Sequence, residues 1–113
     1  MPVSNSYMEY VIEQLSHNSP ILTKRMFGGV GIYADGLFFA VIANDQLYFK
    51  VDDTNRQDYI EAGMEPFRPF DGDRPMKYWE VPVQVLEDLD QLKVWQDKSI
   101  VVAQHAKKGK KKK

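Results

Sequence analysis

Two short turn patterns divide the middle of the chain into strands, and they constrain the fold more than any other feature. Asp35-Gly36 favours a two-residue hairpin turn, because a type I′ turn needs positive φ at both positions. The run Leu37–Ala43 is apolar on both alternating faces, which is typical of a central strand buried on both sides. Asn44-Asp45 marks a second turn, and residues alternate again over Gln46–Val51. We therefore predict an antiparallel β-meander here.

Helical periodicity appears on both sides of this meander. We expect an N-terminal helix over Ser6–Ser16, in which Ser6 and Glu9 fit a capping box. A short middle helix is expected over Asn55–Ala62, capped by Asp or Thr and closed by Gly63. A long C-terminal helix is expected over Leu89–Ala106, with Asp88 as N-cap and an inner stripe formed by Leu92, Trp95, Ser99, Val102, Ala103 and Ala106.

The strands predicted outside the meander are short. They are Thr23–Phe27, Gly31–Ala34, an edge strand at Pro66–Phe70 and Met76–Val81. Together with the helices they predict an α+β domain. Its antiparallel sheet, the meander plus additional strands, is flanked by an N-terminal helix, a short middle helix and a long C-terminal helix.

A glycine cluster precedes the meander. The segment from Gly29 to Ala34 fits the loose dinucleotide-binding pattern G-x-G-x-x-[G/A], in which a following helix receives the pyrophosphate. Here a turn and an apolar strand follow instead, so the N–H groups of that helix are missing. We therefore predict no cofactor, and interpret Gly28, Gly29 and Gly31 as a structural bend in the sheet.

Residues that commonly carry catalysis or bind metal are sparse or badly spaced. The chain has no cysteine, and its two histidines, His17 and His105, have no second histidine three or four residues away. The acidic clusters at 52–53 and 71–73 lack the glycine and glutamate that an EF-hand loop needs. We therefore predict no catalytic residues, no metal site and a protein that is not an enzyme.

Charge is distributed unevenly along the chain. Six of the fifteen basic residues lie in the last seven positions, so nine remain against sixteen acidic residues, a net charge of −7 for residues 1–106. We predict a folded domain at 1–106 and a disordered lysine-rich tail at 107–113. The tail can be a solubilising terminus or can neutralise phosphates. Its candidate nucleic-acid contacts are Lys107, Lys108, Lys110, Lys111, Lys112 and Lys113.

No apolar run is long enough to span a membrane, and the N-terminus lacks the pattern of a secretory signal. We therefore expect a cytoplasmic protein without a membrane partner. Basic residues also fall on predicted strands, and Lys24, Arg25, Lys50 and Tyr78 are candidate contacts for an anion or a partner. The alternative is ordinary cross-strand pairing of these cations with Asp or Glu.

The ordered string of residues around the glycines is distinctive. It consists of Lys24-Arg25-Met26-Phe27-Gly28-Gly29-Val30-Gly31-Ile32-Tyr33, Gly36, Phe39-Ala40, Leu47-Tyr48-Phe49-Lys50-Val51-Asp52, Pro66-Phe67, Tyr78-Trp79-Glu80-Val81-Pro82 and Trp95. This string resembles the N-terminal domain of the TfoX (Sxy) family of competence regulators, and the resemblance extends to Ala106. It implies an α+β domain with an antiparallel sheet, a role near transcriptional regulation, and no catalytic residues. The C-terminal helical domain of the full-length regulators is not present in this sequence, so we expect a stand-alone N-terminal-type domain.

These observations leave three hypotheses for function. The first is a non-enzymatic regulatory module that binds an unidentified protein partner. The second is weak, salt-dependent binding of nucleic acid through the lysine tail and a basic strand face. The third is a small-anion or metabolite site near Arg25, Lys50 and Tyr78. Self-association through an edge strand, giving a homodimer, is compatible with each of them.

Overall fold

The computed structural model describes residues 5–26, 29–67 and 77–111. Within them the elements follow in the order α1 (Asn5–Ser16), β1 (Leu22–Met26), β2 (Gly29–Ala34), β3 (Leu37–Ala43), β4 (Gln46–Lys50), α2 (Arg56–Glu61), β5 (Tyr78–Glu80), α3 (Val83–Glu87) and α4 (Leu89–Lys111). The strands form one antiparallel sheet in the order β1-β2-β3-β4-β5. The predicted α+β class is confirmed.

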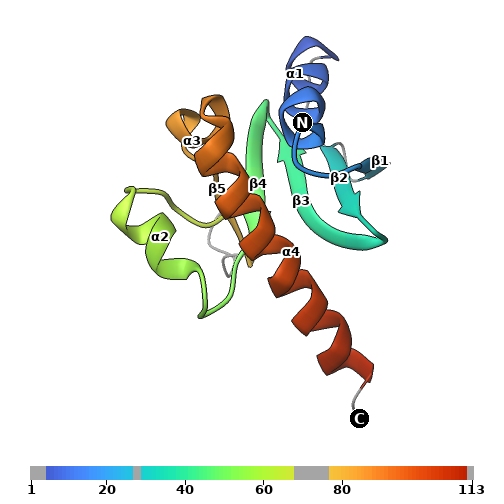
Figure 1. The fold of residues 1–113 in the computed structure, drawn as a ribbon, viewed down its shortest axis with the longest axis vertical. Helices are drawn as coiled ribbons and strands as arrows, with labels where there is room; N and C mark the ends of the chain where they lie inside the picture. Colours follow the sequence, from blue (N-terminus) through green and yellow to red (C-terminus); the bar gives the residue numbers. More distant parts are fainter. Residues whose placement is uncertain (1–4, 27–28, 68–76, 112–113) are drawn as a thin grey trace.

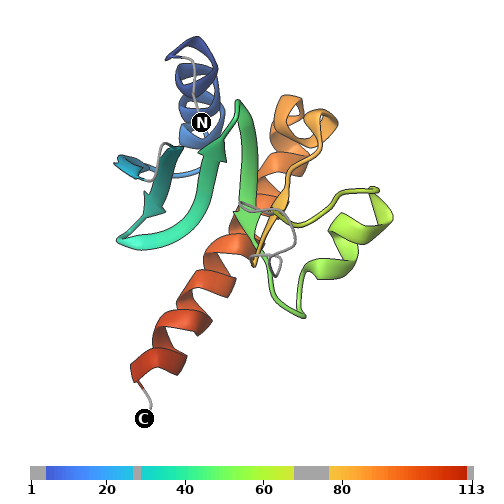
Figure 2. The same cartoon turned by 180° about the vertical axis from the view of Figure 1, so that it is seen from behind.

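The domain has two layers, because α1 and α4 pack on the same face of the sheet. Figure 1 shows α4 running diagonally across the strands, and it contacts β3, β4, α1 and α3. The core between the layers includes Val11 and Leu15 of α1, Leu92 and Ala103 of α4, and the strand residues Val30, Ile32, Phe39, Ala40, Ile42, Leu47 and Phe49. Figure 2 shows the opposite face of the sheet, over which no described helix lies.

Both predicted turns of the meander are confirmed. Asp35 and Gly36 have φ angles of 52° and 77°, and Asn44 and Asp45 both have φ of 54°. Positive φ at both positions gives each turn a twist that matches the twist of the flanking strands. The strands that these turns join pair directly, so local sequence sets the connectivity from β2 to β4.

The strand that contains the glycine cluster begins earlier than predicted, at Gly29 rather than at Gly31. β2 starts at Gly29, so Gly29 and Gly31 both lie inside the strand and pair with Met26 and Lys24 of β1. A Cβ atom at Gly29 would lie 2.5 Å from the carbonyl oxygen of Ile42, and no side chain fits at that distance. Gly29 therefore permits the close approach of β2 and β3. Gly28 lies outside the described residues.

We predict that Gly29→Ala lowers the free energy of unfolding by about 1–3 kcal/mol, because the new methyl group must push β3 away. Chemical denaturation followed by circular dichroism measures this change. Gly36→Ala is the comparison, because its Cβ would meet open space and any loss of stability there comes from the φ of +77° and not from a clash. Equal stability of Gly29→Ala and the native protein would contradict the proposed steric role.

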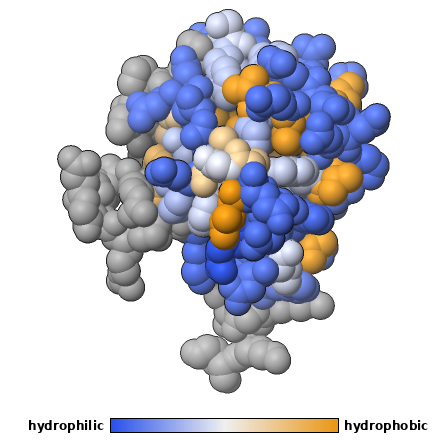
Figure 3. Space-filling model, turned by 90° about the vertical axis from the view of Figure 1, so that its left-hand side faces the viewer, coloured by the Kyte–Doolittle hydropathy of each residue, from blue (hydrophilic) through white to orange (hydrophobic). Residues whose placement is uncertain are grey.

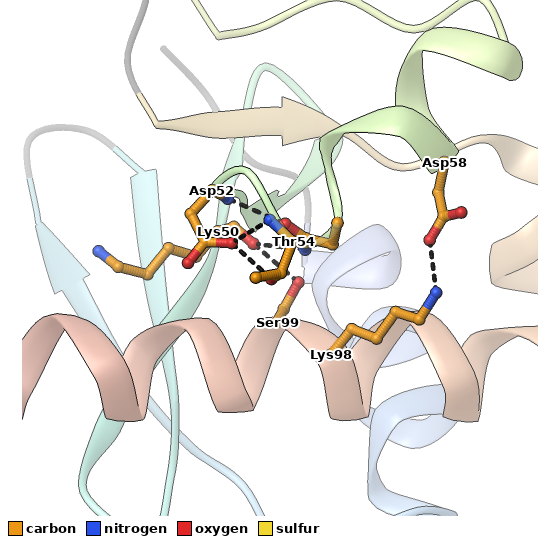
Figure 4. Close-up of polar contacts among 7 residues, drawn as sticks. Lys50, Asp52, Thr54, Asp58, Lys98 and Ser99 are labelled. Carbon is orange, nitrogen blue, oxygen red and sulfur yellow. Dashed lines mark hydrogen bonds and ion pairs between the residues drawn. The ribbon is translucent and has the colours of Figure 1, made fainter.

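A buried asparagine fixes the segment after β4, and a serine of α4 binds the same segment. The Asn55 side chain is 2% exposed; its Nδ2 donates to the Lys50 carbonyl at 3.2 Å, and its Oδ1 accepts from the Asp52 N–H at 2.9 Å. The Ser99 hydroxyl of α4 donates to the same Lys50 carbonyl at 2.9 Å (Figure 4). Asn55 occupies the N-cap position of α2 without a side-chain cap bond, so the prediction of an Asp or Thr cap there is wrong.

Asn55→Ala should lower the free energy of unfolding by about 1–3 kcal/mol, because the partly buried Asp52 N–H loses its side-chain acceptor and the Lys50 carbonyl loses the Asn55 donor. Gln57→Ala, on the exposed side of α2, is the control and should change stability by less than about 0.5 kcal/mol. Thermal unfolding of both variants tests the difference. Equal midpoints for the two variants would show that the Asn55 bonds do not hold this segment.

Several element boundaries differ from the sequence predictions. The helix α3 was not predicted, and it begins directly after Pro82. The predicted edge strand at Pro66–Phe70 is reduced to a bridge between Pro66 and Trp79, and its last three residues lie outside the described residues. α4 continues to Lys111 rather than ending at Ala106. The predicted cap of α4 is confirmed, because the Asp88 carboxylate accepts from the N–H groups of Asp90 and Gln91.

Candidate functional site

The two faces of the sheet carry different kinds of side chain. Val30, Ile42 and Leu47 are cross-strand partners that point into the core under the helices. Their neighbours in the strands point to the opposite face, which we call the open face. Tyr33, Phe38, Val41, Tyr48, Lys50, Tyr78 and Glu80 lie there.

Lys50 and Tyr78, two of the four candidate contact residues, meet on the open face. The Lys50 ammonium donates to the Tyr78 hydroxyl at 3.3 Å and lies 5.0 Å from the centre of the Tyr78 ring. The Phe38 ring lies 5.6 Å from Tyr78 and stacks on Tyr33 at 5.1 Å. Burial, with a further contribution from Tyr33, raises the pKa of Tyr78 to about 12. This tyrosine therefore stays neutral at physiological pH.

The other two candidate residues lie elsewhere. Lys24 and Arg25 are exposed on β1, and β2 and β3 separate β1 from β4. Lys24 pairs with Gly31 and so shares the open face with Lys50, whereas Arg25 pairs with Val30 and points to the helix side. The four candidate residues therefore lie in two separate places, Lys24 and Arg25 on β1, and Lys50 with Tyr78 on β4 and β5. The structure does not bring Arg25 together with Lys50 and Tyr78.

The raised pKa of Tyr78 predicts a loss of stability in alkali. The unfolded chain ionises this phenol near pH 10, while the folded chain holds the proton until about pH 12, so the free energy of unfolding falls across that window. We expect the fall to be about 2 kcal/mol smaller in Tyr78→Phe. Tyr10→Phe, at a side chain that is 38% exposed, is the control. Chemical denaturation at a series of pH values measures the difference. Parallel falls in the free energy of unfolding for Tyr78→Phe and the native protein would contradict the prediction.

The strand β1 forms one edge of the sheet. No described strand pairs with its side away from β2. Leu22 is 73% exposed, and Thr23, Lys24 and Arg25 are also exposed. A strand edge of this kind offers a row of backbone N–H and C=O groups to another chain.

The other edge of the sheet is covered. The Phe67 N–H donates to the Tyr78 carbonyl at 2.7 Å, and the Glu80 N–H donates to the Glu65 carbonyl at 3.1 Å. Pro66, between them, forms a bridge with Trp79 and has no N–H to offer a further strand. Of the two edges, the one along β1 is therefore the one that remains available for strand pairing among the described residues.

The remaining surface offers little else that points to a partner. Figure 3 shows one side of the molecule as mostly hydrophilic, with small separate hydrophobic areas rather than one broad patch. Among the described residues no three His, Cys, Asp or Glu side chains gather as metal ligands do. In the same part of the chain, no helix is long and apolar enough to cross a membrane.

The lysine-rich tail stays a prediction. The backbone of α4 is helical as far as Lys111, so the helix enters the lysine block. The side chains of residues 107–113 lie outside those that the structure describes. The structure therefore does not test the predicted disorder of residues 107–113 or their predicted contacts with nucleic acid.

One polar residue of the helix layer was not predicted to be buried. Gln96 is fully buried where α4 packs against the end of α1, and it lies on the inner stripe that contains Leu92 and Ser99. Its spacing, four residues after Leu92 and three before Ser99, is the pattern that places a residue on the buried face. The helical period could have identified it.

The chain matches the model of a known protein family. The family model described as the TfoX N-terminal domain matches residues 13–103, which is most of the 113-residue chain. No curated protein matches the chain.

Proposed function

Because the chain belongs to the TfoX N-terminal domain family, we propose that it is a non-enzymatic regulatory module whose β1 edge receives an extended segment of a partner protein. The observation that carries this proposal is the contrast between the two sheet edges. The edge along β5 is covered by residues 65–67, whereas the edge along β1 is exposed and ends in the hydrophobic Leu22. The setting we propose is transcriptional regulation in the cytoplasm, the role that the resemblance to competence regulators implies.

Strand addition suits β1 on physical grounds. A partner segment that pairs with this edge extends the existing antiparallel ladder, so main-chain hydrogen bonds supply affinity. Leu22 offers apolar contact area beside the new strand. Side chains at alternate positions of the partner then face Lys24 on one side of the sheet and Arg25 on the other. These contacts supply the specificity.

The positive charges of β1 favour a negatively charged partner segment. Lys24 and Arg25 are both exposed, and neither takes part in the ion pairs found among the described residues. A partner strand that carries carboxylates opposite them gains favourable cross-strand pairs. A second copy of β1 would instead set these cations against one another, which disfavours a homodimer at this edge. We therefore propose an acidic extended segment of a different protein as the partner.

This proposal is tested with synthetic peptides of alternating sequence. An acidic Glu-Val repeat should bind the native protein with an affinity that falls as salt rises, and a Lys-Val repeat of the same length should not bind. Lys24→Glu combined with Arg25→Glu should weaken binding by about tenfold or more, since each exposed ion pair contributes up to roughly 1 kcal/mol. Fluorescence anisotropy of labelled peptides gives the dissociation constants.

A matched control reverses two exposed basic charges elsewhere. Arg56→Glu combined with Lys77→Glu changes the net charge equally but leaves β1 intact, so peptide binding should stay nearly unchanged. Hydrogen exchange should also slow at the β1 amides when the acidic peptide is present. Equal loss of binding in both double variants would contradict the β1 site. Binding of a single-stranded oligonucleotide, but of neither peptide, would favour the nucleic-acid hypothesis instead.

A further inference from the structure

A row of side chains crosses the open face of the sheet, with one member from each strand. It begins at Leu22 of β1, which pairs with Tyr33 of β2, and it ends where Lys50 of β4 pairs with Tyr78 of β5. The Tyr33 ring stacks on Phe38 of β3 at 5.1 Å, and the Phe38 ring lies 5.6 Å from Tyr78. Leu22 is therefore the last member of a mostly aromatic row at the β1 edge.

Leu22 leaves this row open at its outer end. It is 73% exposed, more than any other large hydrophobic residue that the structure describes, whereas its partner Tyr33 is half-buried. Figure 2 shows β1 at the margin of the sheet, and no described strand lies on its outer side. An apolar side chain that joined the row beyond Leu22 would remove this hydrophobic surface from water. The edge therefore favours an apolar residue at one position of a partner strand.

The two cations of β1 lie on opposite faces of the strand. Lys24, two residues after Leu22, shares the open face with it, whereas Arg25 points to the helix side. Consecutive residues of a partner strand also point to opposite faces, so two consecutive carboxylates can meet both cations. A strictly alternating acidic repeat carries its carboxylates on one face, and so it can meet only one of the two cations.

The direction of the partner strand follows from the sheet. Every strand pair in it is antiparallel, and antiparallel pairing is slightly more stable per residue than parallel pairing. From its N-terminus to its C-terminus, an antiparallel partner passes Arg25, Lys24, Thr23 and Leu22 in turn. The complementary order of side chains is therefore acidic, acidic, unrestricted, apolar.

We propose that the β1 edge recognises an antiparallel segment with two consecutive acidic residues and an aromatic residue two positions after the second of them. This inference rests on the strand addition proposed above and specifies the partner. The acidic residues pair with Arg25 and Lys24, and the aromatic ring packs on Leu22 as a further member of the row of Tyr33 and Phe38. An aromatic ring suits this position, because it buries a large apolar area and reaches diagonal neighbours across a sheet.

The probe is the peptide Ser-Thr-Glu-Glu-Thr-Tyr-Thr-Ser, with two control peptides of identical composition. The reversed peptide, Ser-Thr-Tyr-Thr-Glu-Glu-Thr-Ser, carries the same groups in the opposite direction. In Ser-Thr-Glu-Thr-Glu-Tyr-Thr-Ser both glutamates lie on one face. Titration into nitrogen-15-labelled protein should shift the β1 amides and give the probe a dissociation constant about threefold or more below that of either control.

Leu22→Ser tests the apolar contact. It should weaken binding of the probe about threefold, and it should leave unchanged the binding of a version in which serine replaces the tyrosine, because that version has no ring to lose contact. Leu89→Ser is the matched control, since it makes the same change at a leucine of α4 that is 41% exposed. It should leave both affinities unchanged. Circular dichroism checks that both variants keep the fold.

Charge exchange tests the register. Lys24→Glu should weaken binding of the probe, and lysine in place of the second glutamate of the peptide should restore it. Arg25→Glu should instead be restored by lysine in place of the first glutamate. The two mismatched combinations should stay weak, because like charges then face each other across the strands.

The results separate failure of this inference from failure of strand addition itself. Equal affinity for all three peptides, with shifts at the β1 amides, would overturn the proposed order of side chains and leave strand addition standing. Binding neither of these peptides nor of the acidic repeat would overturn both. Tighter binding of the reversed peptide would overturn the antiparallel direction. Equal loss of binding in Leu22→Ser and Leu89→Ser would remove the aromatic contact with Leu22.

Discussion

The packing of α4 across β3 and β4 is the contact on which the rest of the structure depends. Leu92 and Ala103 of the helix lie in one core with Phe39, Leu47 and Phe49 of the strands. Each fully buried large apolar side chain contributes roughly 1.5–3 kcal/mol, so this one interface supplies a large share of the stability of a small domain. α1 and α3 then pack against α4 as well as against each other.

This arrangement also decides where function can reside. One face of the sheet is covered by helices, and one edge is covered by residues 65–67. What remains among the described residues is the β1 edge and the aromatic open face around Lys50 and Tyr78.

Much of the fold was predictable because it is set by local interactions. Both hairpin turns, the strands that they join and the position of α1 follow from residues close together in sequence. The site was less predictable. Arg25, Lys50 and Tyr78 were expected in one candidate site. Lys50 and Tyr78 lie together, but the separation of Arg25 from them depends on strand order and register. The role of Gly29 likewise depends on the distance to Ile42 in the neighbouring strand.

The sequence by itself determined the α+β class, the meander, the inner stripe of α4 and the family to which the chain belongs. Turn geometry and side-chain periodicity act over a few residues, so they can be recognised without a structure. Only the tertiary structure decided which face each cation of β1 occupies. Among the described residues it also decided which sheet edge stays open and that the amide oxygen of Gln96 has no hydrogen-bond partner. These properties arise from contacts between segments far apart in the chain, such as the 81 positions between Leu15 and Gln96, and no local pattern records them.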